Sequence, residues 1–243
     1  MDRKELASGV DPETHWYYQT KKLPLLRYFN EVGKTGDPIS IFDIGAGSGF
    51  FSECLIRSNP GRILDVVRVD TGYAGQEIRE HPQICGRLVT QRDLPESISN
   101  SLVLLMDVLE HVQDDRAFLR TITERCAGTN HFFITVPAFQ SLWSGHDVYL
   151  GHYRRYRLRQ IMDLTASLGI ESTAAYYVYA LIFPALWFVR RVMTGPKNPG
   201  SNMKPIGGFS NAILKWLCGL ELSYCRSNAA FGVTCVLEGR RAS

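Results

Sequence analysis

The chain has 243 residues, 45% of them hydrophobic, and a formal net charge of +3. This length and composition allow one large core, so we expect a single domain over residues 1–243. Lys and Arg are scattered except around Arg154 to Arg159, which argues against a broad basic surface, and we expect no nucleic-acid partner. The six cysteines have neither C-x-x-C pairs nor histidine partners at zinc spacing, and we expect no metal. Charged residues from Asp2 to Glu5 precede any apolar run, so no secretory signal is expected and the predicted location is cytoplasmic.

Apolar runs in the first 170 residues predict strands that alternate with helices, which is typical of a parallel sheet. The predicted helices are Pro12–Val32, Gly49–Ser58, Gly75–Glu80, Asp114–Cys126 and Leu158–Leu168. The predicted strands are Ile39–Ile44, Ile63–Val69, Arg87–Thr90, Leu102–Met106 and Phe132–Val136.

The C-terminal third breaks this alternation. We expect a strand at Ser172–Tyr179, helices at Pro184–Met193 and Asn211–Leu222 around the polar loop Thr194–Ser201, and a last strand at Gly232–Glu238. The uncharged run from Ala174 to Val189 is shorter than the roughly 20 residues that cross a bilayer, and Pro184 interrupts it. A strand that leads into an apolar helix is favoured over a membrane span, and segment 174–193 is a candidate for contact with a membrane surface.

Three glycines on alternate positions follow the first predicted strand, in the segment Asp43-Ile-Gly45-Ala46-Gly47-Ser-Gly49. Glycines here expose backbone amides to a ligand beneath the start of a helix, unless the turn only connects strand to helix. The dinucleotide fingerprint would require Gly or Ala at position 50, where the chain has Phe50. The segment resembles motif I of class I S-adenosylmethionine (SAM) dependent methyltransferases. The resemblance implies that Gly45, Ala46, Gly47 and Gly49 bind the carboxylate of SAM and that Asp43 balances its ammonium group.

Asp70 ends the second predicted strand, at the sheet edge where the glycine turn also lies. A carboxylate there can accept hydrogen bonds from both hydroxyls of a ribose. SAM and NAD both carry that diol, so Asp70 supports an adenosine ligand without choosing between them. Alternatively, Asp70 only begins the turn at Thr71-Gly72.

Two further segments extend the similarity to class I methyltransferases: Leu94-Pro95, and Val108-Leu-Glu110-His111-Val112 after the fourth strand. By this resemblance Asp93 approaches the adenine, and Met106 and Asp107 flank the cofactor. The chain has Thr90-Gln91-Arg92-Asp93 where the family often has a G-D-A type sequence. His111 is a candidate substrate residue, although Glu110 and His111 equally suit cap and surface positions.

A third block, from Thr135 to Tyr156, resembles a V-P-A, L-W-S-x-H-D and G-H-x-R-R-Y run in a bacterial methyltransferase-11/23-like subgroup. Members of this subgroup also carry an early H-W-W-like motif, here His15-Trp16-Tyr17, so the similarity covers nearly the whole chain. It implies a seven-stranded, doubly wound, mostly parallel α/β sheet of Rossmann-like type, with the last strand antiparallel beside the fifth. The implied parts are an N-terminal helical cap (1–36), a SAM-binding core (37–172), an apolar helical substrate cap (173–229), and the last strand and tail (230–243).

The predicted reaction is methyl transfer from SAM, which becomes S-adenosylhomocysteine (SAH), to an oxygen atom of a small lipophilic or aromatic acceptor. Transfer to oxygen needs a base, and His146 beside Asp147 is the first candidate, with His152 the second. Alternatively, these residues only fix the loop. The aromatic residues expected on the acceptor side are Trp143, Tyr149, Tyr179, Phe183, Trp187 and Phe209.

Three other functions stay open at this point. They are a nicotinamide-dependent oxidoreductase, which the glycine spacing disfavours, a SAM-binding protein without catalysis, and a protein or nucleic-acid methyltransferase. The N-P-P-Y-type sequence of methyltransferases that act on nitrogen atoms of nucleic-acid bases or glutamine is absent after the fourth strand, where Asp107-Val-Leu stands. The sequence does not indicate the oligomeric state.

Overall fold

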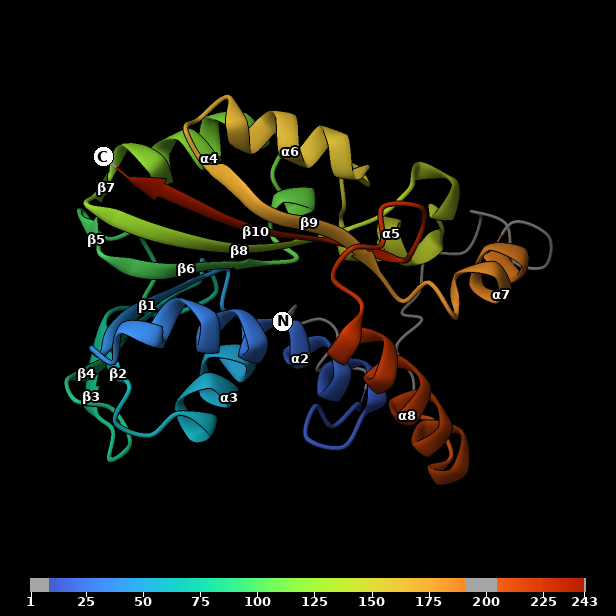
Figure 1. Cartoon of the computed structure of the whole chain (residues 1–243), viewed down its shortest axis with the longest axis horizontal. Helices are drawn as coiled ribbons and strands as arrows, with labels where there is room; N and C mark the ends of the chain where they lie inside the picture. The colour runs from blue at the N-terminus through green and yellow to red at the C-terminus, as the bar shows by residue number, and fades with distance from the viewer. Residues whose placement is uncertain (1–8, 191–204, 243) are drawn as a thin grey trace.

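The computed structural model describes residues 9–190 and 205–242, which form a twisted sheet with helices on both faces (Figure 1). Within these residues the main sheet has eight strands in the order β3-β4-β2-β1-β6-β8-β10-β9. The strands are β1 (Ile39–Ile44), β2 (Ile63–Val69), β3 (Glu77–Glu80), β4 (Arg87–Gln91), β6 (Ser101–Met106), β8 (Thr129–Pro137), β9 (Glu171–Val178) and β10 (Thr234–Ala242). A separate pair joins β5 (Ile98–Ser99) to β7 (Cys126–Ala127).

The central strands β4, β2, β1, β6 and β8 pair in parallel, and β10 pairs antiparallel with both β8 and β9. The predicted antiparallel last strand beside the fifth is therefore confirmed. The predicted number of seven strands is wrong because β3, expected to be part of a helix at Gly75–Glu80, pairs antiparallel with β4. β3 is exposed along its length, and its charged residues are common at a sheet edge.

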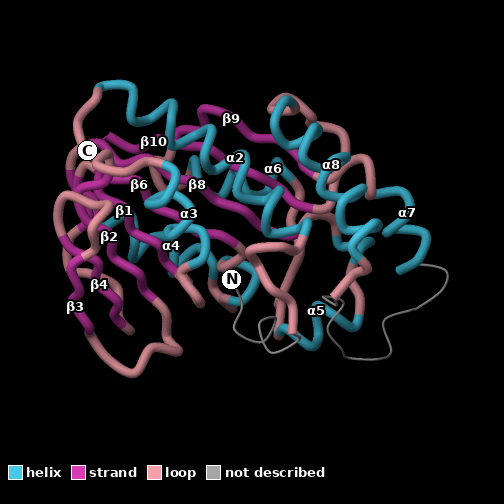
Figure 2. Tube along the Cα trace, turned by 90° about the horizontal axis from the view of Figure 1, so that it is seen from below, coloured by secondary structure: helices cyan, strands magenta, loops and turns pink. Residues whose placement is uncertain are grey.

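Alternating residues of the strands build two cores, one on each side of the sheet. On one side α2 (Trp16–Val32) and α3 (Phe50–Ser58) pack against Ile41, Leu104 and Phe133. On the other side α4 (Asp115–Glu124) and α6 (Leu158–Ala166) pack against neighbouring strand residues such as Val103 and Ile134. Figure 2 shows the same sheet from below.

The remaining helices lie at the carboxyl end of the parallel strands, except the 3-10 helix η1 (Gly33–Thr35), which joins α2 to the start of β1 at the opposite end. The others are α5 (Gly145–Leu150), α7 (Phe183–Phe188), α8 (Gly208–Tyr224) and the short 3-10 helices η2 (Leu109–His111) and η3 (Gln140–Leu142). The predicted loop Thr194–Ser201 and the end of the predicted helix Pro184–Met193 lie outside the described residues. Among the helices that the structure describes, none combines the length and the hydropathy needed to cross a membrane.

Candidate active site

The glycine turn between β1 and α3 has left-handed backbone at Gly45, Gly47 and Gly49, with φ angles of 74°, 55° and 74°. The amide of Gly45 donates to the carbonyl of Val69, at 2.8 Å, which ties the turn to β2. A β-carbon on Gly45 would lie 2.5 Å from Cγ2 of Val108. Glycine is therefore required here both by backbone conformation and by the close approach of the loop after β6.

Asp70 connects the two turns at the carboxyl ends of β1 and β2. One carboxylate oxygen accepts a hydrogen bond from the Gly47 amide and the other from the Gly72 amide, both at 2.8 Å. The carboxylate is therefore fixed beside the glycine turn, at the edge of a cavity of about 580 Å³. This is the place where the sequence predicts the ribose of the cofactor.

The cavity beside Asp70 is here called the cofactor cavity. It is bordered by the glycine turn, the turn after β2 and the loop after β6. Its walls are formed by Ile44, Gly45, Val69, Asp70, Thr71, Gly72, Arg92, Leu94, Asp107, Val108, His111, Val112, Phe118 and Leu150. Three predicted cofactor residues, Gly45, Asp70 and Asp107, line it directly. The other predicted cofactor residues do not line it: Asp43, Ala46, Gly47, Gly49, Asp93 and Met106.

Among these, Asp43 lies beneath the turn, where burial raises the pKa of its carboxyl and hydrogen bonds from Ser52 lower it to a smaller extent. Asp93 is exposed between Arg92 and Leu94, which both line the cavity. Direct contacts of Asp43 with the ammonium of SAM and of Asp93 with its adenine stay predictions.

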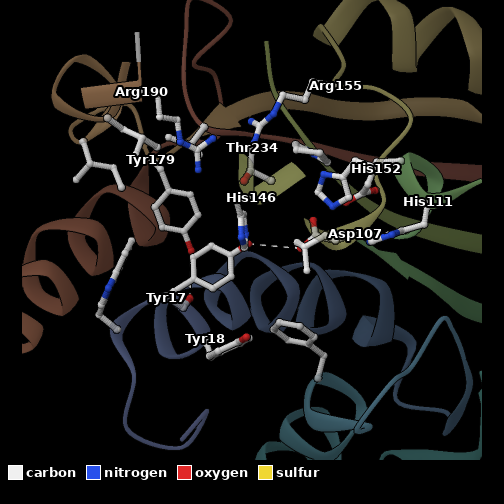
Figure 3. Close-up of a pocket in the computed structure, with 18 residues that line it drawn as sticks. Tyr17, Tyr18, Asp107, His111, His146, His152, Arg155, Tyr179, Arg190 and Thr234 are labelled. Atoms are coloured by element: carbon white, nitrogen blue, oxygen red, sulfur yellow. Dashed lines mark hydrogen bonds between the residues drawn. The ribbon is translucent and has the colours of Figure 1, made fainter. Parts of the chain in front are cut away.

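A second cavity of about 210 Å³, here called the acceptor cavity, adjoins the first (Figure 3). Its walls are formed by Trp16, Tyr17, Tyr18, Phe51, Asp107, Glu110, His111, Pro137, His146, Leu150, His152, Arg155, Tyr179, Ile182, Leu186, Arg190, Val233 and Thr234. Both predicted catalytic histidines belong to this set. Asp107, His111 and Leu150 line both cavities and therefore form their shared wall.

Asp107 is the polar centre of this wall. It follows β6 with a φ of 56°, and its carboxylate forms an ion pair with Lys21 and accepts a hydrogen bond from the Thr135 hydroxyl at 3.0 Å. The Tyr17 hydroxyl donates to the same carboxylate at 3.4 Å. Burial alone would raise the pKa of Asp107, but the charge and hydrogen bond of Lys21, together with the hydrogen bond from Thr135, outweigh burial and lower it. Lys21 has an exposed fraction of only 3%.

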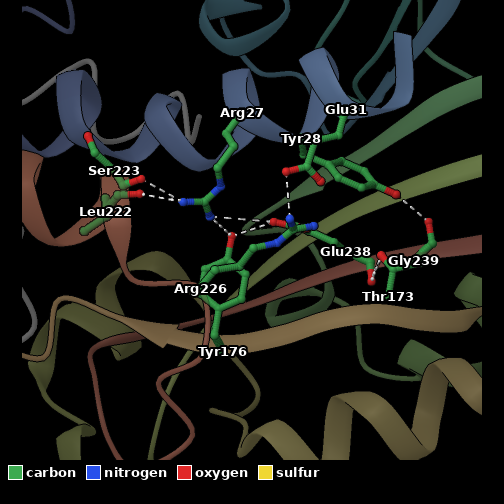
Figure 4. A network of polar contacts seen from close by, with 10 residues as sticks. All are labelled: Arg27, Tyr28, Glu31, Thr173, Tyr176, Leu222, Ser223, Arg226, Glu238 and Gly239. Atoms are coloured by element: carbon green, nitrogen blue, oxygen red, sulfur yellow. Dashed lines mark hydrogen bonds and ion pairs between the residues drawn. The ribbon is translucent and has the colours of Figure 1, made fainter. Parts of the chain in front are cut away.

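A polar network holds α2, which carries Tyr17 and Lys21, against the sheet (Figure 4). Its centre is the fully buried Glu238 of β10, which accepts a hydrogen bond from the Tyr176 hydroxyl at 2.7 Å and forms an ion pair with Arg226. Arg226 also pairs with Glu31 of α2 at 2.7 Å, and Arg27 of α2 donates to the Tyr176 hydroxyl at 2.9 Å. Burial raises the pKa of Glu238 despite the nearby guanidinium groups.

His152 is oriented by a buried carboxylate. Its Nδ1 lies 2.9 Å from Oδ1 of Asp147, and the same oxygen accepts a hydrogen bond from Nε of Arg155 at 2.7 Å. The backbone amide of Ser144 donates to the other carboxylate oxygen at 2.8 Å. Although burial opposes it, these contacts hold the pKa of Asp147 well below its usual range. Asp147 therefore orients His152, although it is adjacent in sequence to His146.

Glu110 is an almost fully buried carboxyl group in the acceptor cavity, with an exposed fraction of 1%. Its Oε2 has no hydrogen-bond partner among the described residues. Burial, and then the neighbouring charge of Asp107, raise the pKa of Glu110 well above its usual range. One possible ligand atom from each of Glu110, His111 and His152 lies within 4.8 Å of the others. This is the one arrangement in the described part of the chain that is suited to hold a metal ion.

Arg190 is a buried cation on the acceptor cavity, with an exposed fraction of 9%. Its guanidinium donates to the carbonyl of Leu142 at 2.8 Å, while its Nε has no partner within residues 9–190 and 205–242. Burial, and then the charge of Arg155, lower the pKa of Arg190 to about 10. Arg155 is neutralised by Asp147, whereas Arg190 has no carboxylate within ion-pair distance among the described residues.

Helix geometry decides which predicted acceptor residues reach the cavity. At α7, Ile182, Leu186 and Arg190 line it at intervals of four, so Phe183 and Trp187 project from another side of the helix. Phe183 packs against Phe139 and Phe231, and Trp187 is 39% exposed. In α5, His146 and Leu150 face the cavity and Tyr149 does not. The predicted acceptor residues outside the cavity are Trp143, Tyr149, Phe183, Trp187 and Phe209, whereas His111 and Tyr179 line it.

Several residues of the site have no assigned role in the sequence prediction: Tyr17, Lys21, Glu110, Arg155 and Arg190. The aromatic motif His15-Trp16-Tyr17 does mark the start of α2. Lys21 lies one helical turn after Tyr17, so this spacing places both side chains on the same face.

Residues 15–173 match the sequence model of a methyltransferase domain family. The chain belongs to this methyltransferase family. The family match indicates a SAM-dependent methyltransferase, with SAM as cofactor and SAH as product, and the fold is that of class I methyltransferases. A search among curated proteins finds no significant match.

Solved structures share the fold at low sequence identity. The 1,6-didemethyltoxoflavin-N1-methyltransferase of Burkholderia thailandensis, solved with 1,6-didemethyltoxoflavin and SAH, is 14% identical and has a TM-score of 0.54. The match covers 94% of this chain and 81% of that one. A SAM-dependent methyltransferase from Archaeoglobus fulgidus is 12% identical, with a TM-score of 0.50 and coverage of 90% and 92%. The magnesium protoporphyrin IX methyltransferase of Synechocystis, with bound SAH, is 12% identical, with a TM-score of 0.50 and coverage of 93% and 84%.

Proposed function

We propose that this methyltransferase transfers the methyl group of SAM to an oxygen atom of a small lipophilic or aromatic acceptor. The observation that carries the proposal is the shared wall of Asp107, His111 and Leu150 between the two cavities. SAM held by the glycine turn and Asp70 would direct its methyl group past these three residues toward an acceptor in the neighbouring cavity. The S–CH₃ bond then breaks with its electron pair left on sulfur, while an O–CH₃ bond forms.

The proton of an acceptor hydroxyl needs a base as the oxygen attacks. His146 is our first candidate because it lines the acceptor cavity, and His152 is the second because Asp147 orients its ring. A neutral imidazole can take up this proton while the methyl group is transferred. The remaining contribution of the protein is to hold donor and acceptor in line and to exclude water.

The acceptor cavity also suggests the chemistry of the acceptor. Its aromatic walls are Trp16, Tyr17, Tyr18, Phe51 and Tyr179, which suit a flat or apolar body. Arg190 adds a cation that has no carboxylate partner in the described part of the chain. Since a buried guanidinium is stabilised by a bound anion, we infer that the acceptor carries a carboxylate or another anionic group.

A polyanionic acceptor is less favoured because the one basic cluster is largely neutralised. Arg154 pairs with Asp115 at 2.9 Å, Arg155 pairs with Asp147, and Arg159 lies 3.7 Å from Asp163. These arginines therefore offer little free charge to a nucleic acid. A protein acceptor and SAM binding without catalysis are kept as alternatives.

Apolar side chains on the outside of α7 and α8 support the lipophilic character of the acceptor and a contact with a membrane surface. On α8, Phe209, Ile213, Trp216, Leu220 and Tyr224 follow one another at intervals of three or four residues and are all exposed. Leu181, Trp187 and Phe188 are exposed near α7. Sedimentation with lipid vesicles tests the contact, and the variant Trp216→Ser should reduce the bound fraction.

The direct test is a screen of phenols, hydroxy acids and lipophilic acids with isotopically labelled SAM. We expect labelled product from an anionic aromatic or lipophilic acceptor, and His146→Ala should lower turnover at least a hundredfold with unchanged SAM affinity in calorimetry. His152→Ala, tested in parallel, identifies which histidine is the base.

Two outcomes of the screen would contradict the proposal. SAM binding without transfer to any acceptor class would favour the non-catalytic alternative, and label on a peptide or nucleic acid would replace the proposed acceptor.

The cofactor site is tested separately. Asp70→Ala should weaken SAM binding without unfolding the protein, and unchanged SAM affinity would remove the assignment of Asp70 to the ribose.

A further inference from the structure

We propose that Glu110, His111 and His152 bind one divalent metal ion, most suitably Zn²⁺, on the wall between the cofactor and acceptor cavities. Binding of the ion is independent of the proposed function, but the role that we assign to it in the reaction rests on that function. The set of two imidazoles and one carboxylate is typical of zinc sites that keep an open position for a further ligand. This proposal differs from our expectation of no metal, which was based only on the spacing of the cysteines.

The first support is the distance between the ligand atoms. One nitrogen or oxygen of each residue lies within 4.8 Å of the others. Zinc bonds of about 2.0–2.2 Å in a tetrahedral site bring ligand atoms to about 3.4 Å from one another. Side-chain rotations that move each atom by about 1 Å are therefore sufficient to close the site around an ion.

The second support is Glu110 itself. Its carboxyl group faces the acceptor cavity, is almost fully buried, and has an Oε2 atom without a hydrogen-bond partner among the described residues. A buried polar atom without a partner is costly, and few occur in native proteins. A bound cation would provide the missing partner.

The third support is the environment of His152. The contact between its Nδ1 and Asp147 directs Nε2 away from Asp147 and leaves its lone pair for a metal. Arg155 and Ser144 fix Asp147 in turn. Histidine ligands of metal sites are commonly oriented by such a carboxylate. The rings of His111 and His152 meet edge to face, with their centroids 4.6 Å apart, so the two candidate ligands lie in direct contact.

The backbone holds the two ligand segments together. Glu110 and His111 belong to η2, which begins two residues after the left-handed Asp107, and His152 follows α5. The amide of Tyr153 donates to the carbonyl of Glu110 at 2.7 Å. This hydrogen bond fixes the spacing between η2 and the segment that carries His152, before any ion binds.

An ion at this position would contact an acceptor beside the methyl donor, because His111 belongs to the walls of both cavities. With three protein ligands, a position stays open for the hydroxyl oxygen of the acceptor. A bound ion would lower the pKa of that hydroxyl, and His146 would be placed to take its proton. His152 is then a metal ligand, which leaves His146 as the base.

Metal binding is tested on full-length protein treated with EDTA and dialysed. Calorimetry with ZnCl₂ and visible absorption with CoCl₂ should show one ion per chain. Glu110→Gln and His152→Ala should each weaken binding at least a hundredfold, and Asp147→Asn about 10- to 100-fold because it removes the orienting carboxylate. His81→Ala is the matched control, since His81 lies outside the cluster beside Glu53. Circular dichroism and a SAM titration confirm that each variant is folded.

Absence of Zn²⁺ and Co²⁺ binding to the parent protein would overturn the inference. So would an equal loss of affinity in His81→Ala, or unchanged affinity in both Glu110→Gln and His152→Ala. Failure of the proposed function has a different signature: the ion binds and the variants lose it, but no hydroxyl acceptor is methylated. Conversely, O-methylation by EDTA-treated protein without ion binding would support the proposed function and exclude the metal.

Discussion

Lys21 of α2 and Asp107 at the end of β6 form an ion pair across 86 residues of sequence, at the wall that the two cavities share. The ammonium of Lys21 is buried, whereas the carboxylate of Asp107 is one-third exposed to the cavity. Through this pair the N-terminal helix closes the acceptor side of the site. It also brings Tyr17, whose hydroxyl contacts the same carboxylate.

Replacement of Lys21 should therefore destabilise the protein as well as alter the site. Lys21→Met removes the cation and leaves Asp107 with only its neutral donors. We expect the free energy of unfolding to fall by about 2 kcal/mol, below the value for fully buried pairs because Asp107 is partly exposed to solvent. Urea denaturation measures this change. Lys22→Met, in which the half-buried neighbouring lysine is replaced, should change it by less than about 0.5 kcal/mol. Equal losses of unfolding free energy in the two variants would show that the ion pair between Lys21 and Asp107 does not stabilise the protein.

The close approach of Gly45 to Val108 can be tested against a glycine with the same φ angle. Gly45 and Gly61 both have a φ of 74°, but a β-carbon on Gly61 meets no atom within 4 Å. Gly61→Ala should cost about 1 kcal/mol of stability from backbone strain alone. Gly45→Ala adds the clash and narrows the cofactor cavity, so we expect a larger loss of stability and at least tenfold weaker SAM binding in calorimetry. Equal SAM affinity in the two variants would show that the approach has no role in binding.

Arg190 should determine affinity for the anionic group of the acceptor. Arg190→Gln keeps a donor near the Leu142 carbonyl but removes the charge. For an acceptor with a carboxylate we expect the KM to rise 10- to 100-fold with a smaller change in kcat, which corresponds to the loss of one charged hydrogen bond. The methyl ester or amide of that acceptor is the matched comparison. If the variant and the parent protein discriminate equally between acid and amide, Arg190 does not bind the anion.

Glu238 should make stability depend on pH. Burial raises its pKa in the folded protein above the value of about 4.3 for an unfolded chain. The folded state therefore binds more protons than the unfolded state in this window, and the contribution of Glu238 to the free energy of unfolding falls as the pH rises from about 4 through the raised pKa. Glu238→Gln removes this dependence. Denaturation at several pH values should show the variant gaining stability relative to the parent protein as pH rises, whereas Glu31→Gln, at the other partner of Arg226, should not. An opposite slope would show that the ion pair with Arg226 dominates burial.

The elements that the sequence predicts best are those with strong local patterns. The apolar run of β1, the glycines after it and the helix that begins at Phe50 all lie within a dozen residues, so propensity and turn chemistry act together. β3 has no such pattern: the stretch Glu77–Glu80 is charged and exposed, and only the free edge of β4 makes it a strand.

The site residues that the sequence does not identify depend on contacts between distant segments. Lys21 is an ordinary helix residue until α2 packs against the end of β6. Glu110 belongs to a visible motif, but its burial depends on the chain around His152. In α7 nearly every residue is apolar, so no polar face indicates that Leu186 rather than Trp187 points into the cavity.

The wall of Asp107, His111 and Leu150 makes the two cavities thermodynamically dependent on each other. Whatever shift of these side chains helps SAM to bind also changes the space offered to the acceptor. By reciprocity, an acceptor that tightens SAM binding by a given factor must itself be bound more tightly by that factor when SAM is present. In the proposed function, exchange of SAM for SAH removes one methyl group at this wall, so the affinity for acceptor and for methylated product would be set by which form of the cofactor occupies the neighbouring cavity.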